Sequence, residues 1–343
     1  MSTTIEIEPS APTGDRGSQG YSTFMSRHSS MMPTFAAMAI LLLLFVGAEA
    51  FLRGDFVTPQ VISALLLDNA YLLVLAVGMT FVIVTAGIDL SVGSVMAFTG
   101  ILLASLLAGG LPAYIAVPVI ILGGALIGLL IGVLIQYFDV QPFIASLAGL
   151  FLARGLAFVV SLSSIRVDDP AIPWLQGTRI QLGDWYITPT GIIALAVVAV
   201  GALVMQFTRF GRTVYAVGGN EQSARLMGLN VARTKVAVYV ISGTCAGLAG
   251  LLLTAYQSAG IPRSGIGTEL DVIAAVVIGG TLLTGGKGYV LGSLVGVMVY
   301  GTINNIIRVM GEDDSWTRIV IGALLLLFIV VQRFVVGRTE RRG

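Results

Sequence analysis

Apolar runs of roughly twenty residues recur along nearly the whole chain. Each run is long enough to cross a hydrocarbon layer of ~30 Å as a helix. A backbone exposed to lipid must satisfy its own hydrogen bonds, so only helices and closed barrels can span a membrane. The runs are continuous and do not alternate in polarity, which excludes a transmembrane barrel. With 56% hydrophobic and 11% charged residues, the sequence predicts an all-α polytopic membrane protein.

The apolar runs divide the chain into three parts. Residues 1–32 are polar and lack a hydrophobic period, so we expect a disordered cytoplasmic tail. Residues 33–335 form the transmembrane domain, and residues 336–343 form a basic cytoplasmic C-terminal tail. We expect about ten spans, at residues 33–52, 61–85, 90–107, 111–138, 141–162, 190–207, 236–256, 270–284, 289–309 and 316–335.

Three of these spans are ambiguous. The first run ends in Ala48-Glu49-Ala50, which also resembles a signal-peptide cleavage site, but the run is long and we favour an uncleaved span. The runs at 90–107 and 270–284 are short and bordered by glycines. We expect broken or re-entrant helices there, covered by protein or lining a water-filled cavity.

Basic residues of the loops predict the orientation, because cytoplasmic loops of membrane proteins carry the excess of Lys and Arg. In our topology the side that holds both termini carries Arg16, Arg27, Arg209, Arg212, Arg225, Arg233, Lys235, Lys287, Arg333, Arg338, Arg341 and Arg342. The opposite side carries Arg53, Arg166, Arg179, Arg263, Arg308 and Arg318. Both termini are therefore expected in the cytoplasm.

One carboxylate, Asp89, lies with glycines and hydroxyls between two apolar runs in Gly78–Ser94. An acid at membrane depth costs several kcal/mol and usually has a function. This segment and Gly211–Glu221 resemble the signatures of permease subunits of bacterial sugar ABC importers of the ribose, arabinose and xylose type, and the resemblance runs from about Ala64 to Gln332. Leu66–Gly100 and Gly265–Leu283 look most similar to permeases of a galactofuranose importer.

This resemblance implies an ABC importer permease fold in a bacterial inner membrane and a small sugar substrate, pentose or furanose-type. It also implies three protein partners: a cytoplasmic ATPase, a periplasmic sugar-binding protein, and a second permease copy or a paralogue. Membrane lipid surrounds such a protein, and the net charge of +1 gives no indication of nucleic acid. The competing hypothesis is an ion-coupled secondary transporter with Asp68, Asp89 and Asp271 as ion sites.

Residues 209–235 form the broadest polar segment on the cytoplasmic side, and we call them the coupling segment. Gly218-Gly219-Asn220 predicts a turn, followed by a short helix from Glu221 to Met227 that Gly228 stops. Glu221 and Gly228 resemble the Glu-Ala-Ala…Gly segment by which ABC permeases dock their ATPase, although Gln222 and Ser223 replace the alanines. The resemblance assigns ATPase coupling to Arg212, Gly219, Asn220, Glu221 and Gly228; the plainer alternative is a solvated connector.

ATP is not expected to bind this chain. The only sequence similar to a phosphate-binding loop is Gly280–Gly288, where Thr281 replaces the first glycine and Gly288 the final hydroxyl. No nucleophile-and-base pair or metal-ligand spacing is present, so we expect a non-catalytic subunit without a cofactor. ATP and Mg²⁺ then belong to the partner ATPase.

Polar residues within the spans are the candidates for a substrate path or gate, because their side chains can hydrogen-bond sugar hydroxyls. For each residue alone, an interhelical bond or a helix cap is an equally plain explanation. Asp89 illustrates both possibilities: it caps the next helix or it holds a gate, for example by pairing with Arg154. The candidates are Asp68, Asn69, Thr80, Thr85, Asp89, Gln257, Glu269, Asp271 and Asn304 with its neighbour Asn305.

Small residues indicate how the helices pack. Gly124, Gly128 and Gly132 are spaced four apart, as are Gly288, Gly292 and Gly296, and such spacing allows close approach of helices in lipid. Cys245, the single cysteine, reads as a further small packing residue. Residues 78–94 and residues 279–293 are weakly similar in sequence, and we call this similarity the internal echo. An internal duplication and chance are both open as its explanation.

Overall fold

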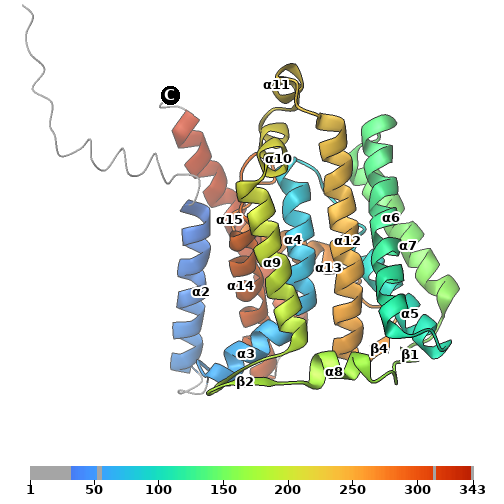
Figure 1. Cartoon of the computed structure of the whole chain (residues 1–343). Coiled ribbons are helices and arrows are strands. Elements are labelled where there is room, and N and C mark those ends of the chain that lie inside the picture. Colours follow the sequence, from blue (N-terminus) through green and yellow to red (C-terminus); the bar gives the residue numbers. More distant parts are fainter. Residues whose placement is uncertain (1–31, 52–55, 312–313, 341–343) are drawn as a thin grey trace, which may run out of the picture.

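The computed structural model describes residues 32–51, 56–311 and 314–340, which form a bundle of helices (Figure 1). The first half contains α2 (Met32–Phe51), α3 (Pro59–Asp68), α4 (Ala70–Val84), α5 (Val92–Ala108), α6 (Ala113–Tyr137) and α7 (Pro142–Val160). The second half contains α8 (Ala171–Gly177), α9 (Pro189–Phe207), α10 (Arg209–Gly219), α11 (Glu221–Leu226), α12 (Val231–Gln257), α13 (Thr268–Ile278), α14 (Val290–Val309) and α15 (Asp314–Glu340).

Strands are minor. Four short ones make two antiparallel pairs, β1 (Ile165–Arg166) with β4 (Ala259–Gly260), and β2 (Ile180–Leu182) with β3 (Trp185–Ile187). Ile165 pairs with Gly260 and Ile180 with Ile187. Figure 1 places β1, β2 and β4 with α8 at one end of the bundle, the α8 end, and α10 and α11 at the other, the α11 end. The all-α prediction is confirmed.

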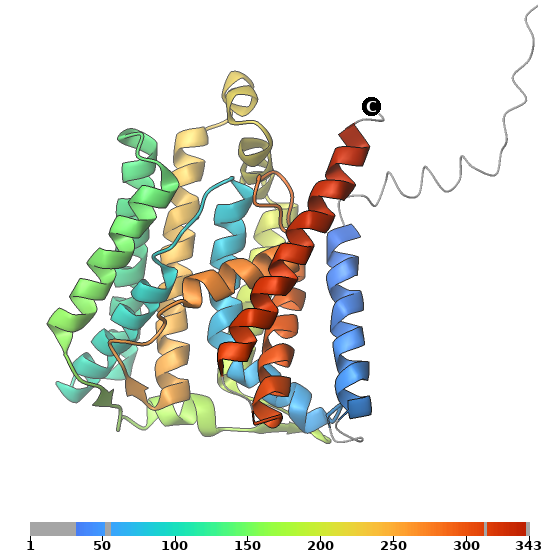
Figure 2. The same cartoon turned by 180° about the vertical axis from the view of Figure 1, so that it is seen from behind.

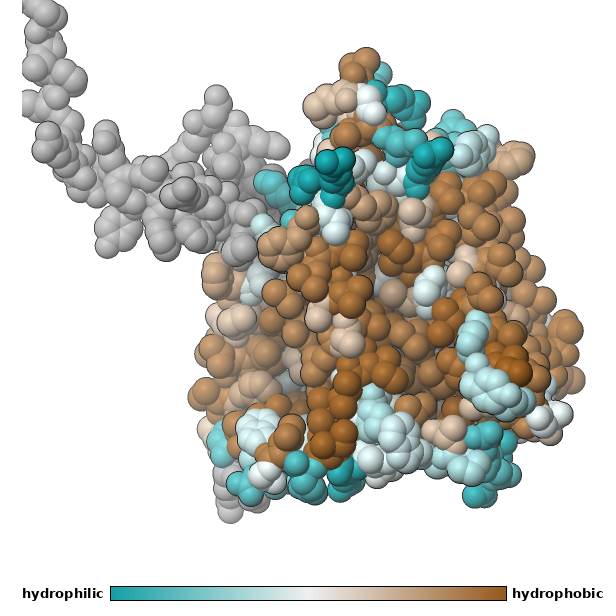
Figure 3. Space-filling view, in the orientation of Figure 1, coloured by the Kyte–Doolittle hydropathy of each residue, from teal (hydrophilic) through white to brown (hydrophobic). Residues whose placement is uncertain are grey.

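Membrane-length helices account for most of the predicted spans. Five helices, α6, α7, α9, α12 and α14, are long and apolar enough to cross a bilayer, and the pair α3 and α4 adds a sixth span if counted as one. Three shorter apolar helices lie at Thr34–Ala50, Val92–Ala108 and Ser315–Val330. These nine elements match nine of the ten predicted spans. On the face shown in Figure 3, an apolar band lies between polar residues at both ends.

The tenth predicted span, residues 270–284, contains only the 11-residue helix α13. Figure 2 shows α13 inclined across the middle of the bundle, so the prediction that this run is no simple crossing is confirmed. The prediction of a break in the other run, 90–107, is wrong, because that run forms the continuous helix α5. An unexpected break lies inside the span 61–85, where α3 and α4 meet at 57°. Asn69 stands at the corner and its amide donates to the carbonyl of Leu65 (2.8 Å).

The described part of the chain begins and ends at the α11 end. Helix α2 starts there and α15 ends there (Figure 1). The predicted N-terminal tail lies outside the described residues apart from Met32, which begins α2. Helix α15 continues to Glu340 and so includes residues 336–340 of the predicted C-terminal tail; the cytoplasmic position of that tail stays a prediction, and residues 341–343 lie outside the description. Helix α2 packs on α14 and buries Ala37 and Ala48; the uncleaved first span stays a prediction.

Helix α12 forms the centre of the bundle and packs backbone-to-backbone on α6. A Cβ on Gly124 would overlap the carbonyl oxygen of Gly243, and a Cβ on Gly128 would overlap that of Tyr239. The predicted packing role of this glycine series is confirmed. In lipid no hydrophobic effect drives helices together, so they associate by close packing, which small residues allow. Cys245 is buried and free, with Gly78 against it.

Candidate functional site

Helices α10 and α11 project from one end of the bundle (Figure 1). The hydroxyl of Thr208 starts α10 by accepting from the N–H of Gly211 (3.1 Å). The amide oxygen of Asn220 starts α11 by accepting from the N–H of Ser223 (2.8 Å). Gly228 has a φ of +77°, the left-handed backbone that lets glycine end a helix. The predicted short helix and its stop are confirmed.

The predicted turn at Gly218 and Gly219 is wrong, because both residues belong to the last turn of α10. Two adjacent glycines favour a turn by propensity. Here they remain helical because Gly218 lies in contact with backbone of two other segments, where a side chain has no room. Tertiary packing therefore decides the conformation.

Glu221 fixes α11 to α12. Its carboxylate pairs with Arg225 one turn later (2.9 Å) and with Lys235 on α12. Burial disfavours the charged carboxylate, but the hydrogen bond and charge of Lys235, with those of Arg225, outweigh burial and hold the pKa of Glu221 below its usual value. Of the other residues assigned to coupling, Arg212, Gly219 and Asn220 are exposed beside it.

Gln222 and Ser223 stand where the similar Glu-Ala-Ala…Gly segment of ABC permeases has two alanines. This difference leaves the packing of α11 intact. Both of these residues face solvent, and Ala224, fully buried against Val217 and Val231, is the small packing residue. Sequence reasoning missed Ala224 because the helical face cannot be assigned from so short a segment.

Two large apolar side chains stand at the tip of α11. Leu226 is 87% exposed and Met227 68% exposed. Apolar side chains of this exposure at a polar end usually mark a surface that binds another protein. The signal in the sequence was a Leu-Met pair directly before a helix-stopping glycine, and it was overlooked.

Asp89 lies in the segment between α4 and α5 and is 1% exposed. Its carboxylate accepts hydrogen bonds from the N–H and hydroxyl of Ser91 (3.0 and 2.6 Å) and from the hydroxyl of Ser242 on α12 (2.7 Å). Ser91 is the N-cap residue directly before α5, so Asp89 forms an Asx-type turn before the helix rather than capping it directly. The bond to Ser242 anchors this segment to α12.

The suggested pairing of Asp89 with Arg154 is wrong. Arg154, on α7, donates to the carbonyls of Pro262 (2.7 Å) and Ser264 (2.8 Å) in the loop before α13. Its nearest acid is Glu269, in the first turn of α13. The guanidinium therefore holds the loop that leads into the short helix. The carbonyl partners lie over 100 residues away in sequence, which no local pattern could reveal.

Three of the path candidates join a polar cluster towards the α8 end. Asp68, at the end of α3, interacts with the hydroxyl of Tyr256 and with Arg308 in the last turn of α14. Asp271, in the first turn of α13, interacts with the hydroxyl of Tyr300 and with Arg318. Gln257 lies beside Tyr256 and accepts from the hydroxyl of Ser264 (3.1 Å).

The cluster contains basic and aromatic residues that we did not predict. Arg308 and Arg318 were counted only as loop residues, and the tyrosines were not among the candidates. Tyr71 lies among the same charged groups. Asn304 and Asn305 are partly buried on α14, within one turn of Arg308. Tyrosines in apolar helices are the signal that could have found the cluster, because a buried hydroxyl needs a partner.

The remaining candidates are enclosed by protein. Thr80 is fully buried and its hydroxyl lies 2.7 Å from that of Ser293 on α14. Thr85 donates to the carbonyl of Val82 (2.8 Å) and Asn69 to that of Leu65. One carboxylate oxygen of Glu269 is buried without a hydrogen-bond partner and lies against Gly93 of α5. Thr80 and Glu269 therefore contact a second helix, whereas Thr85 and Asn69 bond to the preceding turn of their own segment.

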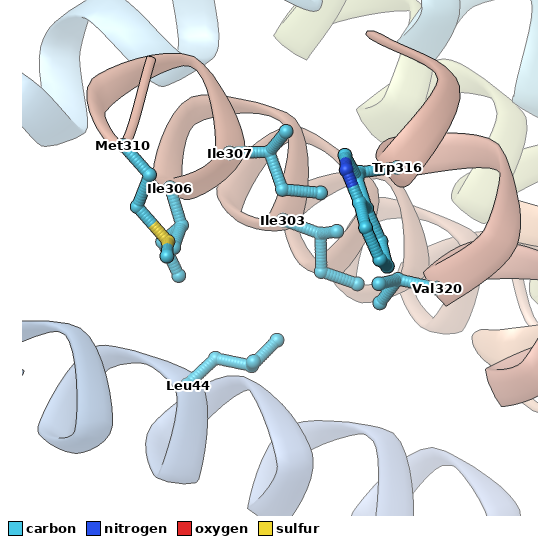
Figure 4. Close-up of a pocket in the computed structure, with 7 residues that line it drawn as sticks. All are labelled: Leu44, Ile303, Ile306, Ile307, Met310, Trp316 and Val320. Carbon is cyan, nitrogen blue, oxygen red and sulfur yellow. The ribbon is translucent and has the colours of Figure 1, made fainter. Parts of the chain in front are cut away.

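An apolar cavity of about 400 Å³ lies between α2, α14 and α15 (Figure 4). Its wall is made by Leu44, Ile303, Ile306, Ile307, Met310, Trp316 and Val320. A sugar entering it would lose hydrogen bonds to water and regain almost none, because the lining has a single N–H, on Trp316. The cavity is therefore not the path for a polar solute.

Comparison with known proteins identifies the family. Residues 61–329 match the family model described as "Branched-chain amino acid transport system / permease component". The chain belongs to this permease family. It is 43% identical to a fructose import permease protein of Bifidobacterium longum, over 90% of this chain and 92% of the relative. No solved structure gives a significant match.

Two further relatives agree in length and class. The permease is 44% identical to an inner membrane ABC transporter permease protein of Escherichia coli, over 84% of this chain and 88% of the relative. It is 38% identical to a ribose import permease protein of Haemophilus influenzae, over 85% and 90%. The chain is thus a multi-pass membrane protein and the non-catalytic permease component of a sugar ABC importer.

Proposed function

We propose that this permease carries a pentose or furanose-type monosaccharide, galactofuranose among the candidates, across the bacterial inner membrane, driven by ATP that a separate cytoplasmic ATPase hydrolyses. Relatives named for fructose, ribose and arabinose import support the sugar class. The resemblance of Leu66–Gly100 and Gly265–Leu283 to galactofuranose permeases supports the furanose form. ATP and Mg²⁺ belong to the ATPase.

The exposed tip of α11 is the main structural support for this proposal. Leu226 and Met227 form an apolar knob that α11 presents to solvent, and the ion pair between Glu221 and Lys235 fixes it to α12. A secondary transporter has no reason to display such a knob. Arg209, Arg212, Arg225 and Arg233 lie on α10, α11 and the first turn of α12 at the same end, and they support a cytoplasmic position for the α11 end under the positive-inside rule.

The opposite end suits a periplasmic sugar-binding protein. Here the polar cluster reaches from Asp68 and Arg308, at helix ends, to Asp271 on α13. Its carboxylates, guanidinium groups and tyrosine hydroxyls can exchange hydrogen bonds with sugar hydroxyls. A second copy of the permease, or a paralogue, would provide the second coupling segment that a pair of ATPase domains requires.

Docking of the ATPase is the test. The permease, produced with the ATPase encoded beside it, is purified as wild type, Leu226→Glu and Leu182→Glu. Leu182 is 61% exposed at the α8 end, so it controls for the substitution itself. We expect Leu226→Glu to weaken the complex by about 2 kcal/mol or more, as for a central interface anchor, and Leu182→Glu to leave it intact. Equal binding by all three proteins would contradict docking through α11.

The ion-coupled alternative assigns ion binding to Asp68, Asp89 and Asp271. The carboxylate of Asp89 is already engaged by three hydrogen bonds from two serines, and Asp68 and Asp271 each face an arginine. These contacts favour structural or sugar-binding roles over a vacant cation site.

A further inference from the structure

The last turn of α10 contacts the end of α4, where one linker begins, and also a second, glycine-rich linker. One linker, residues 85–91, joins α4 to α5, and the other, residues 279–289, joins α13 to α14. A Cβ on Gly218 would overlap the carbonyl oxygen of Val84, at the end of α4, and would lie 2.7 Å from the backbone nitrogen of Gly286. The N–H of Gly286 also donates to the carbonyl of Val84 (2.9 Å). Three segments therefore meet at Gly218.

The contacts are made by backbone rather than side chains. Gly285 and Gly286 have φ values of +81° and +75°, which glycine alone adopts readily. A Cβ on Gly285 would lie 2.8 Å from the Cβ of Ala86, and one on Gly286 would lie 2.9 Å from the Cα of Gly219. Backbone in contact with backbone cannot absorb a displacement by changing rotamers, so a shift of one segment displaces the others.

Two side chains of α10 strengthen the junction. The hydroxyl of Tyr215 donates to the carbonyl of Gly288 in the second linker (2.6 Å). The ring of Phe210 stacks on that of Phe81 of α4, with centroids 6.3 Å apart. A cavity of about 250 Å³, lined by Ala86, Gly219 and Lys235 among others, lies beside the junction and gives the segments room to shift.

Each linker leads to a polar element in the interior. The first continues to Asp89, bound to Ser242 of α12, and then to α5. The second is preceded by α13, which carries Glu269 and Asp271. The elements also touch, because Gly93 in the first turn of α5 contacts the Glu269 carboxylate. They are thus joined at the middle of the bundle and at α10.

We propose that Gly218 and Tyr215 are the positioning residues through which movement of the coupling segment displaces the α4–α5 and α13–α14 hairpins together, opening and closing the route past Asp271. This inference rests on the proposed docking of an ATPase at α11. It explains why the second linker carries Gly285 and Gly286 where it approaches the last turn of α10.

Gly218→Ala tests the junction, with Gly322→Ala as the matched control. A Cβ on Gly322 of α15 meets nothing within 4 Å. Both variants therefore add one methyl group to a helix, but only that of Gly218→Ala pushes α10 away from the end of α4 and the second linker. Each is purified with its ATPase and binding protein, and sugar uptake and ATP hydrolysis are measured in vesicles. We expect Gly218→Ala to retain the ATPase but to transport at least about fivefold less sugar per ATP, the lower end of typical coupling between sites.

If Gly218→Ala does not fold, Tyr215→Phe provides the test instead, because it removes only the hydroxyl that donates to the carbonyl of Gly288. It should also lower the sugar transported per ATP while the ATPase remains bound and melting stays within a few degrees of wild type. The proposal is overturned if Gly218→Ala transports as much sugar per ATP as wild type. If Gly218→Ala is unfolded, the same result in Tyr215→Phe overturns it. Failure of the wild-type permease to bind the ATPase would instead refute the proposed function.

Discussion

The hydroxyls of Thr80 and Ser293 lie 2.7 Å apart in the interior of the bundle. Each belongs to one of the two segments that echo each other in sequence, so the segments are bonded directly as well as through the junction at Gly218. The echo is partial in three dimensions: Val92 begins α5 and Leu291 lies at the start of α14, but Gly78 lies inside α4 whereas Gly279 ends α13.

Breaking this bond should destabilise the pairing of α4 with α14. Thr80→Val preserves the shape of the side chain and removes the hydroxyl, and we expect a loss of about 0.5–1.5 kcal/mol of unfolding free energy. A double-mutant cycle with Ser293→Ala, followed by thermal or denaturant unfolding in detergent, isolates the pairwise term. Purely additive effects would show that the two hydroxyls do not interact.

Asp89→Asn should be tolerated, because the carboxylate meets hydrogen-bond donors and no described basic side chain forms an ion pair with it. The amide oxygen of asparagine can still accept from Ser91, and the Ser242 hydroxyl can rotate to accept from the amide nitrogen. We expect uptake in vesicles near the wild-type value. Asp89→Leu leaves the donors of both serines unsatisfied and should cost about 1–3 kcal/mol for each.

Loss of uptake in Asp89→Asn with an unchanged melting temperature would contradict this structural role. It would show that the negative charge itself acts in the transport cycle.

The ion pairs of Glu221 predict a dependence of stability on pH. Because the folded pKa of this carboxyl lies below its ordinary value of 4.5, its contribution is fully present above that value and is lost as pH falls through the folded pKa. The side chain is 38% exposed, which limits the contribution to less than about 1 kcal/mol.

Melting of wild type and Glu221→Gln from pH 3 to pH 7 measures this contribution. The melting temperatures should differ at neutral pH and converge in acid, and Lys235→Gln should remove most of the difference. A constant difference across the range would show that the ion pairs do not stabilise the fold.

Gly228 should resist substitution for a backbone reason alone. A Cβ there meets nothing within 4 Å, but the φ of +77° is strained for residues with a side chain. Gly228→Val should therefore cost about 1–2 kcal/mol in the stop of α11 and weaken ATPase binding. Gly228→Asn is the matched control, because asparagine tolerates the left-handed region. Equal ATPase binding by both variants would exclude the backbone explanation.

The sequence predicted the parts of this fold that depend on local pattern. Apolar runs located nine helical spans, and the order of Asn220, Glu221 and Gly228 predicted α11 and its stop. The bend at Asp68–Asn69 was missed because neither proline nor glycine marks it. The helical state of Gly218 and the partners of Arg154 depend on contacts between distant segments, which no single sequence reveals.

The energy source of transport is the most direct test of the account. Vesicles containing the permease and its ATPase, with the sugar-binding protein outside and ATP enclosed, are tested for uptake of labelled ribose, fructose, arabinose and galactofuranose. We predict that one of these sugars accumulates only with hydrolysable ATP, and that collapsing proton and sodium gradients with ionophores has no effect. Uptake that proceeds without ATP and stops when the ion gradients collapse would contradict the account.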